Sequence, residues 1–475
     1  MKKLLILVGV VTVAISGALS YHQALREREV VILSTNDMHA STANFARLAT
    51  AVALCRDTVA TVLTDAGDRW TGNAFVDLAE GRRPIIDLMN KVGYDVVTLG
   101  NHEFDMGAAF LSDAIAYAEF PTVCANVVSH RDDFKPLPKC LKFTTKNGVR
   151  ICFSGVVTNY DNGHPDGDNA IFEGLEFPDP MQSAREVLAT CGKGCDLRVL
   201  LSHMAELKDM EFASDFDGYD VIIGGHSHGV VDTLVGRSVI GQTGRKLRMV
   251  GATRIRLKGN KITDISYENI DLAGYVEDKE VAAMVEQIHR NEELTASVGT
   301  LGVSLNRIGL AELETRLIAE ATDSEIGFYH YGGIRLTELS EGGVSLATLF
   351  DLEPFFSKIY TMRMTPAQLR AMIIAKFNDT ANTKESHRVD MFCSTPYDIL
   401  VDAAGEAVDV RFPLLTEGRV YKVAMADYIA KKYPSIEATD IQPLPIKVLD
   451  VLAAHFREHS PVTADNTPKQ RIIRK

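Results

Sequence analysis

Residues 95–105 read DVVTLGNHEFD, an apolar run followed at once by a cluster of polar side chains. A short run of Val and Leu residues indicates a strand that is buried on both faces of a sheet. The cluster then places Asn101, His102, Glu103 and Asp105 within five positions. Two interpretations are open at this point: a capped turn with no further role, or a metal site with its catalytic acid beside it.

The same pattern occurs four more times along the first half of the chain: VVILSTNDMHA at 30–40, ATVLTDAGD at 60–68, LRVLLSHM at 197–204 and YDVIIGGHSHG at 219–229. Helical patterns lie between several of these runs, for example GRRPIIDLMNKVG at 81–93. Strands that alternate with helices predict an α/β layered domain. Ligands of such sheets bind just beyond the carboxyl ends of the strands, which is where all five polar clusters are expected.

The bulk composition is that of a globular protein with room for a large core. The chain has 475 residues, of which 46% are hydrophobic and 24% charged, and this length suggests two or three domains. The net charge of −13 makes a nucleic-acid polymer an unsuitable partner. It does not exclude a small phosphorylated substrate, because bound cations can reverse the local field.

The N-terminus resembles an export signal over residues 1–20. Lys2 and Lys3 precede an apolar run at 4–19, and small residues follow at the spacing that a signal peptidase accepts. The alternative is an uncleaved membrane anchor, but the run has 16 residues and a bilayer span needs about 20. We therefore expect export to the periplasm or surface of a bacterial cell, with no stable membrane span after cleavage.

Seven cysteines are compatible with disulfides in an exported protein. Cys191 could pair with Cys195, or Cys124 with Cys140, but the connectivity cannot be derived from the sequence. An odd number of cysteines leaves at least one thiol without an intramolecular partner. The sequence does not determine the oligomeric state.

The segment EDKEVAAMVEQIHRNEEL at 277–294 predicts one amphipathic helix. We expect it to form a linker over 277–297 between two domains. TPAQLRAMIIAKF at 365–377 predicts a further helix, with Pro366 in its first turn. The last dozen residues are expected to be frayed.

The five clusters supply carboxylates, an amide and imidazoles, but no thiols. This set suits divalent ions such as Zn, Mn or Fe. Taken singly, each residue has an ordinary explanation, such as a core histidine or a Gly-Asp turn. Together they give more ligands than one tetrahedral ion accepts, so we expect two ions with Asp68 as the bridge; the candidate ligands are Asp37, His39, Asp68, Asn101, His203, His226 and His228.

A family resemblance makes this hypothesis more specific. TNDMH, GDRWTG, GNHEFD, LSHM and GGHSH match, in order, the blocks of the calcineurin-like metallophosphoesterases, and resemble most closely the bacterial 5′-nucleotidase / UDP-sugar hydrolase family. YGGIR at 331–335, the stretch 344–369 and YKVAMADYIA at 421–430 resemble blocks of the same family's C-terminal half. The resemblance implies a four-layer α/β/β/α domain over 28–270. A helix would join it to a smaller α/β substrate-binding domain over 298–475.

The resemblance also assigns roles to the candidate residues. Asp37, His39, Asp68 and His228 would hold the first metal, and Asp68, Asn101, His203 and His226 the second. His102 and Asp105 would form the catalytic pair, in which Asp105 orients His102 and His102 assists the leaving oxygen. Asp105 as a cap of the following helix remains an alternative, and Glu103 is expected to be solvated or paired nearby rather than catalytic.

On the substrate side, the family's C-terminal domain binds the nucleotide with an Arg of the Gly-Gly-Ile-Arg block and two aromatic rings. Arg335 matches that Arg, and Phe392 is a candidate ring. The alternatives are a surface ion pair for Arg335 and a core position for Phe392. The chain departs from the family at His330, where Asn is expected, and at 431–440, which lacks the expected glycines.

These features predict an exported two-metal phosphohydrolase that converts nucleoside 5′-monophosphates into nucleoside and phosphate. A cyclic phosphodiesterase or a UDP-sugar pyrophosphatase with the same metals is the alternative within hydrolases. A surface-binding protein without turnover is the alternative of another class, but such a protein would need neither His102 nor Asp105.

Overall fold

The computed structural model describes residues 27–160, 163–167, 169–379, 388–432 and 438–474. The chain forms two compact units. The first contains the chain up to Arg69 together with residues 83–287, and the second contains residues 70–82 together with the chain from Ile288 onward. The proposed signal at 1–20 lies outside the described residues. Within the described residues, no helix is both long and apolar enough to cross a membrane.

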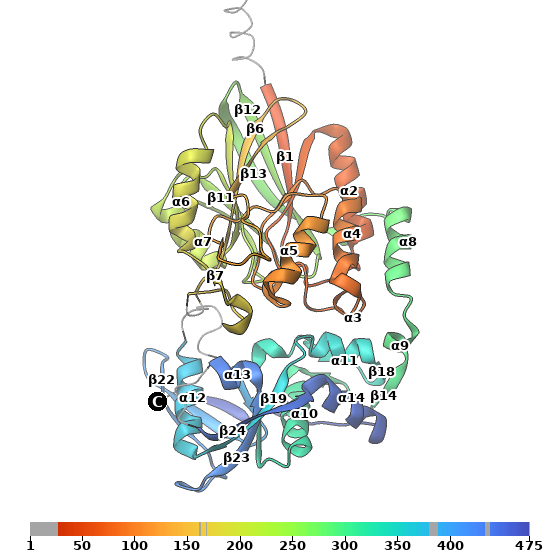
Figure 1. Cartoon of the computed structure of the whole chain (residues 1–475), viewed down its shortest axis with the longest axis vertical. Coiled ribbons are helices and arrows are strands. Elements are labelled where there is room, and N and C mark those ends of the chain that lie inside the picture. Colours follow the sequence, from red (N-terminus) through yellow and green to blue (C-terminus); the bar gives the residue numbers. More distant parts are fainter. Residues whose placement is uncertain (1–26, 161–162, 168, 380–387, 433–437, 475) are drawn as a thin grey trace, which may run out of the picture. The chain divides into compact units, whose positions relative to one another are not determined.

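Two sheets form the centre of the N-terminal unit (Figure 1). The first has the order β13 (Lys261–Asp271), β12 (Met249–Lys258), β1 (Glu27–Thr35), β2 (Ala60–Asp65) and β3 (Val96–Val97). The second has the order β10 (Val230–Val235), β11 (Ser238–Thr243), β9 (Val221–Ile223), β8 (Leu197–His203), β6 (Arg150–Val157) and β5 (Cys140–Thr144). Strands β1, β2 and β3 run parallel, as do β6, β8, β9 and β11.

The two sheets pack face to face because their strands are apolar on both sides. In β8, Val199 and Leu201 belong to a core shared with Val30 and Ile32 of β1. Leu200, which points to the other face, packs with α6 (Pro180–Cys191) and α7 (Glu206–Asp215). Helices α2 (Phe45–Thr58), α4 (Arg83–Val92) and α5 (Gly107–Tyr117) lie on the side of the first sheet (Figure 1). The expected four-layer α/β/β/α order is confirmed.

The second unit is a smaller α/β domain, as expected. Its main sheet has the order β20 (Met391–Cys393), β16 (Ile326–His330), β23 (Tyr421–Ala426), β19 (Lys358–Met364) and β24 (Thr439–Lys447). One face packs on α10 (Arg307–Ala321), α11 (Leu346–Leu352) and α14 (Val448–Glu458), and the other on α12 (Pro366–Phe377). Thr365 and Gln368 form a capping box at the start of α12, so the helix predicted at 365–377 is confirmed.

Four sequence-based expectations differ from the structure. The disulfide joins Cys140 to Cys191, so neither expected pair forms. The linker region contains two helices, α8 (Lys279–Ile288) and α9 (Glu292–Thr295), because the Asn291 side chain caps a new helix start. The C-terminal residues are not frayed but form β25 (Gln470–Arg474), which pairs with β21 (Tyr397–Val401). Residues 70–82 pack with the second unit, where Ala74 is fully buried in its core.

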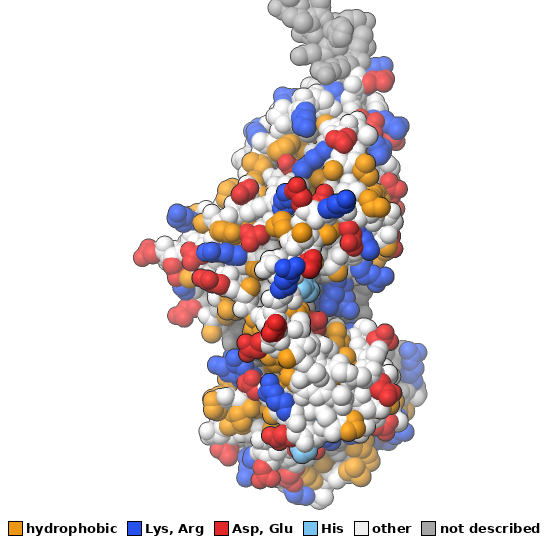
Figure 2. All heavy atoms as spheres, turned by 90° about the vertical axis from the view of Figure 1, so that its right-hand side faces the viewer, with side chains coloured by type: hydrophobic (Ala, Val, Ile, Leu, Met, Phe, Trp, Pro, Cys, Tyr) orange, Lys and Arg blue, Asp and Glu red, His pale blue; other side chains and the backbone are white. Residues whose placement is uncertain are grey.

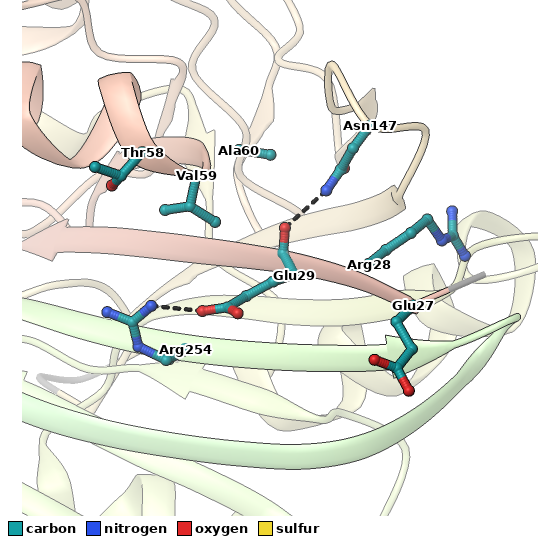
Figure 3. Close-up of a pocket in the computed structure, with 8 residues that line it drawn as sticks. All are labelled: Glu27, Arg28, Glu29, Thr58, Val59, Ala60, Asn147 and Arg254. Atoms are coloured by element: carbon teal, nitrogen blue, oxygen red, sulfur yellow. Dashed lines mark hydrogen bonds and ion pairs between the residues drawn. The ribbon is translucent and has the colours of Figure 1, made fainter.

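Acidic and basic side chains are interspersed over the face of the molecule that Figure 2 shows. A surface hollow near the start of β1 is lined by charged, polar and apolar residues (Figure 3): Glu27, Arg28, Glu29, Thr58, Val59, Ala60, Asn147 and Arg254. There Arg254 forms an ion pair with Glu29, and Asn147 Nδ2 donates to the Glu29 carbonyl at 2.7 Å. The hollow lies at the opposite end of β1 from the polar cluster at Asp37.

Candidate metal centre

All five polar clusters lie at the carboxyl ends of strands, as the sequence pattern predicts. Asp37 and His39 follow β1, Asp68 follows β2, and Asn101 follows β3. His203 is the last residue of β8, and His226 and His228 follow β9. Five of these residues have a positive φ angle: Asp37, His39, Asp68, His226 and His228. A positive φ is uncommon outside glycine and is typical of functional loops.

The seven side chains converge in two overlapping groups. Ligand atoms of Asp37, His39, Asp68 and His228 lie within 4.8 Å of one another, and so do those of Asp68, His203 and His226. Asn101 joins the second group, because its Oδ1 lies 3.0 Å from His226 Nδ1. Asp68 belongs to both groups, since its Oδ2 lies 3.3 Å from His203 Nε2 and 3.9 Å from His39 Nε2.

The donors fit a pair of divalent cations. Buried His203 donates through Nδ1 to the Ala66 carbonyl at 2.7 Å, whereas its Nε2 has no hydrogen-bond partner among the residues that the structure describes. The Nε2 atoms of His39 and His228 face each other at 2.8 Å. A buried polar atom without a partner is costly, and imidazole nitrogens beside carboxylates are suitable ligands for Zn²⁺ or Mn²⁺.

Burial and the neighbouring charges shift the pKa values of these residues in opposite directions. Burial raises the pKa of Asp37 to about 7 against the opposing effect of His203. Burial also opposes ionisation of Asp68, but His203, His102 and His39 together hold its pKa well below the usual range. Burial lowers the pKa of His203, yet Asp68 more than compensates and raises it to about 10. Asp68 is therefore the most persistently negative group at the centre of the cluster.

His102 and Asp105 form the expected pair beside the cluster. His102 Nδ1 lies 2.9 Å from Asp105 Oδ2, within a single helical turn that ends before α5. The N-cap position of α5 belongs to Met106 and not to Asp105. The His102 ring lies at 5.2 Å from that of His39, measured between ring centroids.

Sequence reasoning missed two polar residues that support the cluster. Asn36 donates to Asp37 Oδ2 at 2.6 Å and to the Gly244 carbonyl at 2.8 Å, and it accepts from the Thr243 backbone N–H. Glu103, expected to be solvated or paired nearby, is 1% exposed and accepts backbone hydrogen bonds from the loop of Asp68. The only signal for either residue was its position beside a candidate ligand.

The two candidate substrate residues lie in the second unit but have different surroundings. Phe392 is 4% exposed and packs in the hydrophobic core, which matches the core alternative. Arg335 is half-buried, and its guanidinium lies 5.5 Å from the centre of the Phe355 ring, a contact that the sequence did not suggest. His330 stacks on Tyr428 with ring centroids 4.4 Å apart. The glycine-free stretch at 431–440 includes 433–437, which lie outside the described residues.

Two family models match the chain. The calcineurin-like phosphoesterase model matches residues 30–230, and the model of the 5′-nucleotidase C-terminal domain matches residues 294–439. The trifunctional nucleotide phosphoesterase protein YfkN of Bacillus subtilis is 24% identical over an alignment of length 417 that covers 74% of this chain. This chain spans 28% of the length of the Bacillus protein.

Two further relatives match along nearly the whole chain. Protein UshA of Yersinia enterocolitica is 22% identical over an alignment of length 484 that covers 87% of this chain and 86% of that protein. The crystal structure of a 5′-nucleotidase precursor from Thermus thermophilus has a TM-score of 0.80 and 18% identity, covering 94% of this chain and 99% of that one. At this identity the structural likeness shows the fold alone.

Proposed function

Because the chain belongs to the calcineurin-like phosphoesterases and carries a 5′-nucleotidase C-terminal domain, we propose that it hydrolyses nucleoside 5′-monophosphates to nucleoside and phosphate. The observation that carries this proposal is the pair of ligand groups that share Asp68. A buried carboxylate common to two sets of imidazole and carboxylate donors suits a pair of divalent ions. A single structural zinc would use four donors.

In this proposal, residues 28–270 form the catalytic domain, except for the segment 70–82, which packs with the second unit. Asp37, His39, Asp68 and His228 hold one ion, and Asp68, Asn101, His203 and His226 hold the other. Two such ions would supply hydroxide as the nucleophile at neutral pH and would neutralise charge on the phosphoryl oxygens. Zn²⁺ and Mn²⁺ both suit the donor set, and the positive φ angles of the ligand residues support a preformed arrangement.

His102 acts on the leaving group. Its Nδ1 faces Asp105 at 2.9 Å, so the carboxylate accepts a hydrogen bond from Nδ1–H and leaves Nε2 for the substrate. From there, His102 donates a hydrogen bond or a proton to the departing ribose oxygen. Asp105 fixes the orientation of the ring, which is the usual effect of a carboxylate on the second nitrogen of a catalytic His.

The C-terminal domain, residues 298–475, supplies the groups that recognise the nucleoside. Arg335 is the candidate for a polar contact, and the half-buried Phe355 ring beneath it is better exposed than Phe392 for stacking on a base. His330 replaces the family's Asn and stacks on Tyr428, which changes the surroundings of the proposed base site and leaves room for a second candidate function. In that case the same metal pair hydrolyses a cyclic nucleotide or a UDP-sugar.

The proposed signal at 1–20 supports export, and a phosphatase outside the cytoplasm would release nucleosides for uptake. This part of the proposal is independent of the catalytic centre. It can be tested by cell fractionation of a tagged full-length chain with and without residues 1–20.

The activity itself is tested with metal-loaded protein and four substrates: AMP, UDP-glucose, a cyclic nucleotide and bis-p-nitrophenyl phosphate. We expect inorganic phosphate from AMP at the highest kcat/KM. Faster release of UMP from UDP-glucose would favour a UDP-sugar pyrophosphatase. Faster release of a nucleoside monophosphate from the cyclic nucleotide would favour a cyclic phosphodiesterase. A lack of product from all four would favour a binding protein.

A further inference from the structure

Glu103 is a buried carboxylate to which sequence reasoning gave no catalytic role. It lies in the short helical turn that also carries His102, and it is 1% exposed. Its Oε1 accepts from the Arg69 backbone N–H at 2.7 Å, and its Oε2 accepts from the Asp68 backbone N–H at 2.9 Å and from that of Gly100. A buried charge is tolerated only when it is paired and hydrogen-bonded, and these three donors satisfy that condition.

The donors come from two different loops. Asp68 and Arg69 follow β2, whereas Gly100 follows β3. The Arg69 side chain adds a charged partner, because its Nε lies 3.5 Å from Glu103 Oε1. The same guanidinium donates through Nη1 to the Thr98 carbonyl at 3.2 Å, at the end of β3. One carboxylate therefore joins the loop that carries the shared ligand to the loop that carries Asn101 and His102.

The two loops are in direct contact, so a small shift of one is transmitted to the other. A Cβ placed on Gly100 would lie 2.2 Å from Asp68 Oδ1 and 2.6 Å from the Asp68 backbone nitrogen. A Cβ placed on Gly67, which has a φ of +95°, would lie 2.4 Å from the Gly100 nitrogen. A direct hydrogen bond also joins the two loops, because the His102 backbone N–H donates to Asp68 Oδ1 at 3.0 Å.

We propose that Glu103 is a positioning residue for the metal pair: by holding the backbones of Asp68 and Gly100 together, it fixes the carboxylate of Asp68 where it can bridge two ions. This inference rests on the proposed function, because it needs Asp68 as a shared ligand. Glu103 itself does not touch substrate or metal. Its effect passes through backbone hydrogen bonds to the residues that do.

The substitution Glu103→Gln tests the proposal with little change in volume. A Gln amide presents an N–H₂ group where one carboxylate oxygen now accepts, so a donor would face backbone donors in one of the two loops. We expect one ion of the pair to bind about 10–100-fold more weakly, as is typical when the partners of metal ligands are removed. Isothermal titration with Mn²⁺ measures the affinity, and the exchange-coupled signal in electron paramagnetic resonance reports whether two ions share a bridge.

Asp196→Asn is the matched control. Asp196 is also a buried carboxylate, which accepts from the Arg150 backbone N–H at 3.0 Å and from its guanidinium at 2.7 Å. It precedes β8, at the opposite end of that strand from His203. We expect Asp196→Asn to lower the melting temperature of the metal-free protein but to leave both Mn²⁺ affinities and the coupled signal unchanged.

Two results would overturn the inference: native Mn²⁺ affinities with a native coupled signal in Glu103→Gln, or an equal loss of both in Asp196→Asn. If Glu103→Gln does not fold, Glu103→Asp takes its place. It keeps the charge but is too short to reach donors in both loops, and the same loss of affinity is expected. If the unsubstituted protein binds no pair of ions, the proposed function fails first. If the unsubstituted protein binds a coupled pair of ions and Glu103→Gln binds it equally well, only the positioning role of Glu103 is refuted.

Discussion

The carboxylate of Asp68 accepts a hydrogen bond from the backbone N–H of His102, with 3.0 Å between Oδ1 and the nitrogen. Its other oxygen, Oδ2, lies 3.3 Å from His203 Nε2. The residue that we propose as the shared metal ligand thus also fixes the backbone of the residue that we propose as catalytic. Metal binding and turnover should therefore be separable at the His102 side chain but not at Asp68.

The substitution His102→Ala is expected to lower kcat by about 10²–10⁴-fold, the range for loss of a general acid, while both ions stay bound. Asp105→Asn should lower kcat in the same direction, because the carboxylate that orients the ring is lost. Metal content and initial rates measured on the same preparation check this. His130, an exposed histidine paired with Glu176 at 2.9 Å, is the control, and its Ala variant should behave as the native protein. A native rate for His102→Ala would refute the catalytic assignment.

Gly100→Ala is expected to abolish binding of the metal pair. The added Cβ would lie 2.2 Å from Asp68 Oδ1, closer than any real contact, and 2.6 Å from the Asp68 backbone nitrogen, so the loop itself would have to shift. The control is Gly274→Ala, whose Cβ would meet nothing within 4 Å. Equilibrium dialysis against Zn²⁺ or Mn²⁺ measures the effect. Retention of both ions by Gly100→Ala would mean that the loops are looser than described.

Phe392 and Phe355 should respond differently to truncation. Phe392 is a core residue, and its change to Ala is expected to lower the free energy of unfolding by about 3–5 kcal/mol. Phe355 is half-buried beside Arg335, so its change to Ala should raise KM for a nucleotide but leave the hydrolysis of p-nitrophenyl phosphate unchanged. Urea denaturation and steady-state kinetics of both variants test this. The reverse pattern would restore Phe392 as the substrate-binding ring.

Two buried acids should make the stability of the second unit fall as the pH rises. Burial raises the pKa of Glu353 from 4.5 to about 7, against hydrogen bonds from Ser357 and Tyr329. Burial raises the pKa of Glu314 well above its usual value, with a further contribution from Glu353, and neither Glu314 oxygen has a hydrogen-bond partner among the described residues.

A carboxyl group whose pKa is higher in the folded state stabilises the fold fully below its unfolded pKa. That contribution is lost as the pH rises through the folded pKa. The loss should thus begin above pH 4.5 and be large by about pH 7 for Glu353. Glu314→Gln removes one titrating group, and we expect its free energy of unfolding at pH 8 to be higher than that of the native chain. Glu320→Gln, on the exposed side of the same helix, is the control. Parallel stability curves for the native chain and Glu314→Gln from pH 5 to pH 8 would contradict this.

The sequence was sufficient for the layered fold and for the ligand cluster, because both depend on local patterns. Parallel strands such as β1, β2 and β8 bring the residues after them to one edge, so Asp37, Asp68 and His203 could be grouped before any coordinates. The pairing of Asp105 with His102 was implied by the family resemblance, and the short helical turn that carries both brings their side chains together.

Features that depend on contacts between residues far apart in the chain could not be predicted from the sequence. Glu103 accepts from residues that precede it by 35 and 34 positions, and nothing in the sequence marks a backbone N–H as a partner. The Cys140–Cys191 disulfide spans 51 positions and required the knowledge that α6 packs on β5. The break between α8 and α9 arises from one side-chain cap at Asn291, which an amphipathic pattern across 277–294 conceals.

The most direct test is a crystal structure of the protein grown with Mn²⁺, with anomalous diffraction recorded at the manganese edge. The account predicts two peaks about 3.5–4 Å apart, one beside Asp37, His39 and His228 and the other beside Asn101, His203 and His226, with Asp68 between them. A single peak, or two peaks that do not share Asp68, would contradict it.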